Sequence, residues 1–449
     1  MSKQRIQLSD HFTYSRLLRF VLPCIGTMLF TSIYGIVDGL CVSNFVGKTA
    51  FAAVNLIMPL PMLLGTIGFM LGTGGSAIVG ITLGEGDQEK ADRYFTLFLL
   101  AALVSVSVLA VLGIVFLRPI AVLLGAKGEL LDYAVRYGRI LMVSLPTFAL
   151  QNMFQSFFVT AEKPHLGFWF TVGAGCTNMV LDVLMVGIWG WGVEGAAIAT
   201  FISQLVGGVL PVFYFIDRSN SSRLHLCKTS FYSKVLRDAC INGSSELMTN
   251  LSMSLVNILY NYQLLRLAGE NGVAAYGVIM YAAFLFVAVF VGYAVGSAPI
   301  VSFHYGARNH AEVHNLYRKS LRLIAVVAVT LTLASMFIIP CVARIFVGYD
   351  AELLALTSRA FRLYALSFLI MGFNVYASSF FTALGDGVTS ALISFLRTLA
   401  FQVIAILLLP LLLGIDGIWL AVTAAELAAL AVSAAMLLTK DKVFHYRKA

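Results

Sequence analysis

The segments NMFQSFFVTA (residues 152–161) and NVYASSFFTA (residues 374–383) follow one pattern, 222 positions apart. At this offset Asn152 pairs with Asn374, and Thr160-Ala161 pairs with Thr382-Ala383. The same offset pairs glycines along most of the chain: Gly47 with Gly269, Gly74 with Gly296, Gly84 with Gly306, Gly192 with Gly414, and Gly195 with Gly417. Chance matches would not keep one offset over such a distance, so the chain is a duplicated unit.

The composition places this unit in a membrane. Of the 449 residues, 59% are hydrophobic and 12% are charged, whereas soluble domains carry roughly 25% charged residues. A spanning helix needs ~20 apolar residues, so we expect about twelve transmembrane helices. The second and eighth are long and glycine-rich and are expected to protrude or bend. The predicted spans are 17–43, 52–83, 94–117, 134–160, 165–189, 193–216, 239–265, 272–303, 320–346, 358–384, 389–412 and 415–438.

Each half holds an even number of spans, so both halves enter the membrane from the same side. They are then parallel repeats related by an axis along the membrane normal, in an all-α membrane protein. The predicted domains are an N-terminal six-helix lobe (1–216), a cytoplasmic linker (217–238) and a C-terminal six-helix lobe (239–449). Repeat transporters bind substrate and ions where such lobes meet.

The net charge of +8 could indicate nucleic-acid binding, but its distribution argues against that. The basic residues gather before the first span, in the linker, after the eighth span and at the end of the chain. With alternating spans these positions share one side, which is the positive-inside pattern. We expect a multi-pass protein of the plasma (inner) membrane with both termini cytoplasmic, and no nucleic-acid partner.

Acidic residues inside spans are functional candidates, because a charge at mid-helix costs roughly 3 kcal/mol or more. Asp38 shares one face of the first span with Tyr34, and Asn178 and Asp182 share one face of the fifth. Thr200, early in the sixth span, lies at a similar depth. Oxygens from Asp38, Asn178, Asp182 and Thr200 suit a hard cation such as Na⁺, and the two carboxyl groups could equally hold a proton. The alternative is hydrogen bonding between helices that locks the lobe.

The seventh span carries a second polar stripe that must face a cavity or another helix. It consists of Glu246, Asn250, Ser254, Asn257 and Asn261. Glu246 is a candidate proton or substrate-cation site, with a structural hydrogen bond as the alternative. Methionine and aromatic side chains suit an adaptable site for flat cations. The candidate substrate-binding residues are Tyr34, Gln151, Glu246, Asn250, Asn257, Met280 and Asn374.

Arg397 and Glu426 lie at comparable depths on the last two spans, and we expect them to form a buried ion pair. The six cysteines are scattered without a CxxC pair, so no disulfide or metal framework is expected. No Walker motif and no catalytic constellation is present, so we expect a protein that is not an enzyme and has no cofactor. Na⁺ or H⁺ would be its coupling ion.

Several motifs, each weak alone, combine along the whole chain. They are Pro23 with Tyr34-Gly-Ile-Val-Asp38, Gly74-Gly75-Ser-Ala ahead of Leu83-Gly84-Glu-Gly-Asp87, Asn178-Met-Val-Leu-Asp182, Gly192-Val-Glu-Gly195-Ala-Ala-Ile-Ala-Thr200, and Ser244-Ser245-Glu246. In this combination the chain resembles bacterial members of the MATE family, the multidrug and toxic compound extrusion transporters.

The resemblance implies two six-helix bundles forming a V, alternating access, and cation-driven export of diverse, mainly cationic, drugs and organic compounds. It carries the family's cation site onto Asp38, Asn178, Asp182 and Thr200, and an acidic position of the seventh span onto Glu246. Some relatives also have acidic residues in the tenth span, and this chain has none there. The expected partners are small organic substrates and membrane lipid, with the monomer as the working unit.

A lipid-linked or metabolite flippase of the same broader superfamily is the alternative function. Such a flippase is expected to carry more buried arginine or lysine for phosphate headgroups, and Arg397 is the only deeply placed basic residue in the predicted spans. A polytopic membrane enzyme or a receptor fits less well, because the halves are duplicated and no catalytic constellation is found.

Overall fold

The computed structural model describes residues 6–46, 48–348 and 350–446, without the side chains of 39–45, 48, 51, 345 and 346. Gly47, the repeat partner of Gly269, lies outside the described residues. The first half contains α1 (Tyr14–Phe45), α2 (Lys48–Ile57), α3 (Pro59–Gly84), α4 (Gln88–Leu123), α5 (Gly128–Thr160), α6 (Pro164–Leu181), the π-helix η1 (Asp182–Ile188), α7 (Gly192–Gln204), the π-helix η2 (Leu205–Val209) and α8 (Leu210–Ile216).

The second half follows a linker, residues 217–232, that has no helix. It contains α9 (Ser233–Gly306), α10 (His310–Val347), α11 (Ala351–Ala365), α12 (Phe368–Ala383), α13 (Gly387–Phe395), the π-helix η3 (Leu396–Ala400), α14 (Phe401–Leu413), α15 (Ile415–Thr439) and the short α16 (Asp441–Phe444).

The helices have the length and composition of membrane spans. Among the described residues, nine are long and apolar enough to cross a membrane, and the bent pair α11–α12 makes a tenth. The 74-residue α9 holds two spans that meet at Gly269. The more polar α5 packs along α3 and α4. With α9 counted twice and α5 included, the described chain has the twelve spans that the sequence predicts.

Several span boundaries differ from the prediction for local reasons. The second span is two helices, since α2 ends at Ile57 and Pro59 begins α3. Proline lacks the N–H that a continuous helix would need there. The seventh and eighth spans form one long element whose backbone leaves helical geometry at Gly269 (φ 61°, ψ −151°), a conformation that glycine adopts at little cost. The tenth span begins early, at Ala351, and bends by 45° between α11 and α12.

The contacts between the halves follow the internal repeat. A Cβ on Gly84 would lie 2.0 Å from the Phe303 carbonyl oxygen, and a Cβ on Gly306 would lie 2.1 Å from the Ile81 carbonyl oxygen. Gly84 and Gly306 are repeat partners, and so are Ile81 and Phe303. Gly84 thus faces Phe303, and its repeat partner Gly306 faces Ile81, which is the repeat partner of Phe303. A two-fold axis between parallel halves produces such reciprocal contacts. Only glycine allows α3 and α9 to approach so closely.

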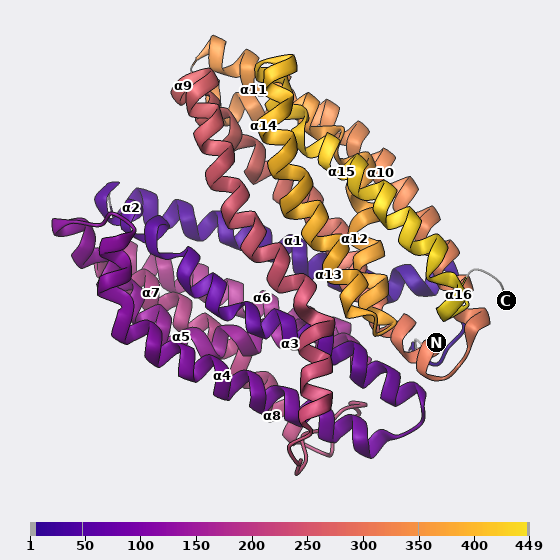
Figure 1. Cartoon of the computed structure of the whole chain (residues 1–449). Helices are drawn as coiled ribbons and strands as arrows, with labels where there is room; N and C mark the ends of the chain where they lie inside the picture. Colours follow the sequence, from indigo (N-terminus) through magenta and orange to yellow (C-terminus); the bar gives the residue numbers. More distant parts are fainter. Residues whose placement is uncertain (1–5, 47, 349, 447–449) are drawn as a thin grey trace.

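The two bundles form a V (Figure 1). The first bundle (α1 to α8) and the second (α9 to α16) converge at the end of the molecule where both termini lie, hereafter the terminal end. They diverge toward the opposite end, where α2 and α11 lie. Residues that face the partner bundle are thus packed at one end and separated at the other.

Candidate functional site

The four predicted cation-site residues come together inside the first bundle. Asp38 is on α1, Asn178 on α6, Asp182 begins η1 and Thr200 is on α7. The Asp182 side chain is fully buried, and it is close enough to Asp38 for the two carboxyl groups to interact. Asn178 Nδ2 donates to Thr200 Oγ1 over 3.5 Å. The turn of π-helix that starts at Asp182 is a feature often found at functional sites.

Most oxygens of this cluster have no hydrogen-bond donor. Asp38 Oδ1, Asn178 Oδ1 and both carboxyl oxygens of Asp182 are buried without a partner. An unpaired buried carboxylate is costly, and two side by side repel each other as well. A cation or a proton would offset both costs. The arrangement is thus chemically suited to hold one or the other.

Tyr137 of α5 is a neighbour of this cluster that the sequence reasoning missed. Its ring is fully buried and lies near enough to interact electrostatically with both Asp38 and Asp182. Its hydroxyl group is 3.9 Å from the Met58 sulfur atom. A tyrosine in an otherwise ordinary span carries no signal in the sequence, because only the packing of α5 against α6 and α7 brings it there.

A cavity of about 280 Å³ lies where the bundles meet. Glu246, Asn257 and Met280, all predicted substrate-binding residues, line it. The rings of Tyr260 and Tyr276 form part of the wall and stack with centroids 4.9 Å apart. The cavity thus combines one half-buried carboxylate with aromatic faces and a flexible thioether. Such a surface suits organic cations of varied shape.

The predicted ion pair between Arg397 and Glu426 is present and forms one edge of this cavity. Arg397 Nε donates to Glu426 Oε1 over 2.8 Å, and Asn374 Nδ2 donates to Glu426 Oε2 over 2.7 Å. Ser433 Oγ in turn donates to Asn374 Oδ1 over 2.9 Å. Glu426 is therefore neutralised and held in place. Arg397, in η3, also acts electrostatically on Glu246 across the cavity.

The remaining predicted substrate-binding residues are not among those that line the cavity. Asn374 lies behind Glu426 and binds it. Asn250 donates to the Glu246 carbonyl oxygen one turn earlier in α9, over 2.9 Å. Gln151 is buried in the first bundle against Gly207. Tyr34 packs there beside Phe30, with ring centroids 6.2 Å apart.

Comparison with known proteins agrees with this architecture. A family model described as MatE matches residues 23–184 and 247–408. The chain belongs to the MATE family of transporters. The two matched segments are equal in length and fall one in each half, as the internal repeat requires. Together they cover well over half of the chain.

Relatives of this MATE-family chain match over nearly its whole length. The multidrug export protein MepA of Staphylococcus saprophyticus is 21% identical over 436 residues, which cover 96% of this chain and 95% of the relative. MepA of Staphylococcus aureus strain MSSA476 is 22% identical over 433 residues, with the same coverage of both chains.

Solved structures share the fold of this MATE-family chain. An outward-facing multidrug resistance MATE family transporter of the MOP superfamily superposes with a TM-score of 0.91 at 23% identity, over 100% of both chains. A MATE crystal structure in complex with MaL6 superposes with a TM-score of 0.92 at 22% identity, also over 100% of both chains.

Proposed function

We propose that this chain is a cation-coupled antiporter that exports small, mainly cationic, organic compounds by alternating access. The observation that carries the proposal is the cavity between the bundles, with the Glu246 carboxylate set among aromatic and methionine side chains. The MepA relatives, which are described as multidrug export proteins, support a broad cargo range.

Coupling to Na⁺ or H⁺ is assigned to the cluster of Asp38, Asn178, Asp182 and Thr200. A bound cation or proton would stabilise the unpartnered oxygens of this cluster. The cluster lies inside the first bundle, apart from the cavity. Cation binding there would change how α1 packs on α6, and α1 also packs on α9 of the second bundle. Binding in the first bundle could therefore alter the contact between bundles.

The proposed setting is the plasma (inner) membrane, with the terminal end in the cytoplasm and the monomer as the working unit. The basic residues of the linker and of both terminal segments support this orientation, because positive loops stay on the cytoplasmic side. The V would then open away from the cytoplasm, in the state that releases cargo.

The charges of the cavity favour this function over a lipid-linked or metabolite flippase. A site for a phosphate headgroup needs basic side chains that are free to bind it. Among the described residues that line the cavity, the one basic side chain is Arg397, and Glu426 already neutralises it. The remaining charge is the carboxylate of Glu246.

Transport in proteoliposomes tests the proposal. Purified protein is reconstituted, and uptake or release of an organic cation is followed under a Na⁺ gradient and a pH gradient imposed separately. We expect one of the two gradients to drive cargo against its own gradient. Movement of cargo that neither gradient affects would refute coupled antiport.

A further inference from the structure

A short segment before α1 lies against the terminal ends of both bundles. Residues 6–13, here named the N-terminal strap, have no helix but are firmly packed, since the side chains of Leu8 and Phe12 are fully buried. The Phe12 ring meets the edge of His304 near the end of α9, with centroids 6.3 Å apart. The strap is thus an ordered part of the interface.

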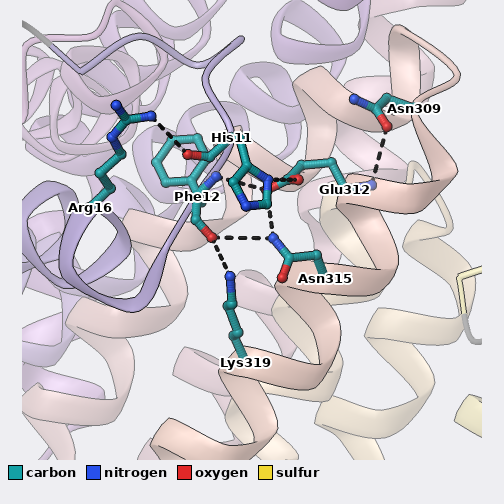
Figure 2. Close-up of polar contacts among 7 residues, drawn as sticks. All are labelled: His11, Phe12, Arg16, Asn309, Glu312, Asn315 and Lys319. Carbon is teal, nitrogen blue, oxygen red and sulfur yellow. Dashed lines mark hydrogen bonds and ion pairs between the residues drawn. The ribbon is translucent and has the colours of Figure 1, made fainter.

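Glu312, in the first turn of α10, holds the strap to the second bundle (Figure 2). Its Oε1 accepts from the Phe12 backbone N–H over 2.9 Å, and its Oε2 accepts from His11 Nδ1 over 2.6 Å. The Phe12 carbonyl oxygen accepts from Lys319 Nζ over 2.6 Å and from Asn315 Nδ2 over 3.2 Å. Three α10 side chains therefore bind the strap at Phe12, two of them through its carbonyl oxygen.

The contact that the Glu312 side chain makes is unusual for the third residue of a capped helix. Asn309 caps α10 by accepting from the Glu312 backbone N–H over 3.1 Å. A glutamate at this position of a capped helix commonly returns to the N–H of its own capping residue. Here the carboxylate binds the N–H of Phe12 instead, some 300 positions away in the chain. The carboxylate that commonly caps its own helix thus links the segment before α1 to the second bundle.

The other end of the strap is fixed to the first bundle. The Leu8 backbone N–H donates to Glu162 Oε1, in the loop between α5 and α6, over 2.9 Å. Arg223 of the linker donates to the same oxygen over 2.7 Å and lies 4.9 Å from the centre of the Phe303 ring of α9. Glu162 is thus a second anchor where segments of both halves meet.

The linker makes an analogous contact with the first bundle. Just as the strap leads into α1 and binds α10, residues 225–229 precede α9 and bind α4. The His225 N–H donates to Asp92 Oδ1 over 3.0 Å, and the Cys227 N–H donates to Thr96 Oγ1 over 3.1 Å. In each half, the segment before the first helix thus binds the other bundle. The analogy holds only for the segments and not for single residues, because His225 and Cys227 correspond to residues 3 and 5, and the repeat partner of Glu312 is Lys90.

We propose that the N-terminal strap is the latch that holds the terminal ends of the two bundles together, with Glu312 as its positioning residue. The inference rests on alternating access from the proposed function. The bundles must part at the terminal end to load cargo, and parting them separates Glu312 from Phe12 or Leu8 from Glu162. Weakening the Glu312 contact then favours the state that is open at the terminal end.

The test measures the distance between the bundles directly. Spin labels are placed by Lys90→Cys on α4 and Lys442→Cys on α16, both exposed, in a chain whose native cysteines are replaced. Pulsed EPR in liposomes then gives the distance distribution with native Glu312 and with Glu312→Gln. We expect a longer distance to gain population in Glu312→Gln, with the open-to-closed ratio rising by about tenfold, as for the loss of one charged hydrogen bond.

Controls separate a latch from a merely structural contact. Glu85→Gln removes an exposed carboxylate at the same end and should leave the distances unchanged. If Glu312→Gln fails to fold, His11→Ala removes one partner at a 64% exposed site and should shift the distances in the same direction, by less. A lower melting temperature with unchanged distances would overturn the latch.

The distance measurement also stands apart from the transport experiment, because it needs neither cargo nor gradient. A shift in a chain that does not export would leave the latch intact and refute the proposed function. Unchanged distances in a chain that exports would refute the latch alone.

Discussion

Neutralising Glu246 should weaken export of a cationic cargo far more than export of a neutral cargo of the same shape. The perturbation is Glu246→Gln, which keeps the size of the side chain and removes its charge. Two opposite charges about 4 Å apart interact by roughly 4 kcal/mol at an effective dielectric constant near 20. A neutral cargo loses only a contact.

The structure reduces this figure. Glu246 is only half-buried, so solvent screens part of its attraction for a cation, while Arg397 and Glu426 neutralise each other and add no free charge to the cavity. If roughly a third of that interaction energy, about 1.4 kcal/mol, remains after screening, loss of the Glu246 charge changes the affinity for a cationic cargo about tenfold. We therefore expect apparent affinity for the cation to fall by about tenfold and that for the neutral analogue by less than twofold.

The assay compares initial export rates of a quaternary ammonium compound and its neutral carbon isostere in proteoliposomes. Glu246→Ala shows the effect of lost packing, and Glu270→Gln removes an exposed carboxylate near the break in α9 as a matched control. Melting temperatures are recorded for each variant. An equal loss for both cargoes would remove Glu246 from the substrate pathway.

Asp38→Asn or Asp182→Asn should abolish gradient-driven export while membrane insertion is kept, and native export by either variant at equal expression would contradict the cation-site assignment. Ser221→Cys, in a chain without other cysteines, should resist an impermeant thiol reagent in intact cells, whereas rapid labelling would invert the proposed orientation. Glu426→Ala should lower the free energy of unfolding by roughly 3–5 kcal/mol by stranding the Arg397 charge, and Arg397→Met with Glu426→Met by much less. Similar thermal stability losses for the single and double variants would show that the ion pair is not the source.

The internal repeat made the symmetry of the molecule predictable. Gly84 and Gly306 can be paired from the sequence, and their reciprocal contacts across the two-fold axis follow from two similar halves that enter the membrane from one side. The acidic residues within spans were equally visible. A charged residue inside an apolar membrane helix is energetically costly at any position, so Asp38, Asp182 and Glu246 stand out from their apolar neighbours in the sequence alone.

The depth of a residue could be counted along its helix, but the neighbour it meets could not. Asn374 and Asn257 both look like polar residues in spans, yet one binds Glu426 behind the cavity wall and the other lines the cavity. Tyr137 gave no signal at all. The rotation of each helix about its axis decides these outcomes, and many weak packing contacts set that rotation.

The sequence by itself thus determined the membrane as solvent, the duplicated parallel halves and the acidic positions, because each of these depends on composition or spacing. Only the tertiary structure decided that Glu312 binds Phe12. In the sequence, Glu312 lies before the predicted ninth span (320–346) with no sign of a distant partner, and residues 6–13 show no periodicity. A contact across 300 positions between a backbone N–H and a carboxylate leaves no pattern in a single chain, because any residue other than proline can supply that N–H.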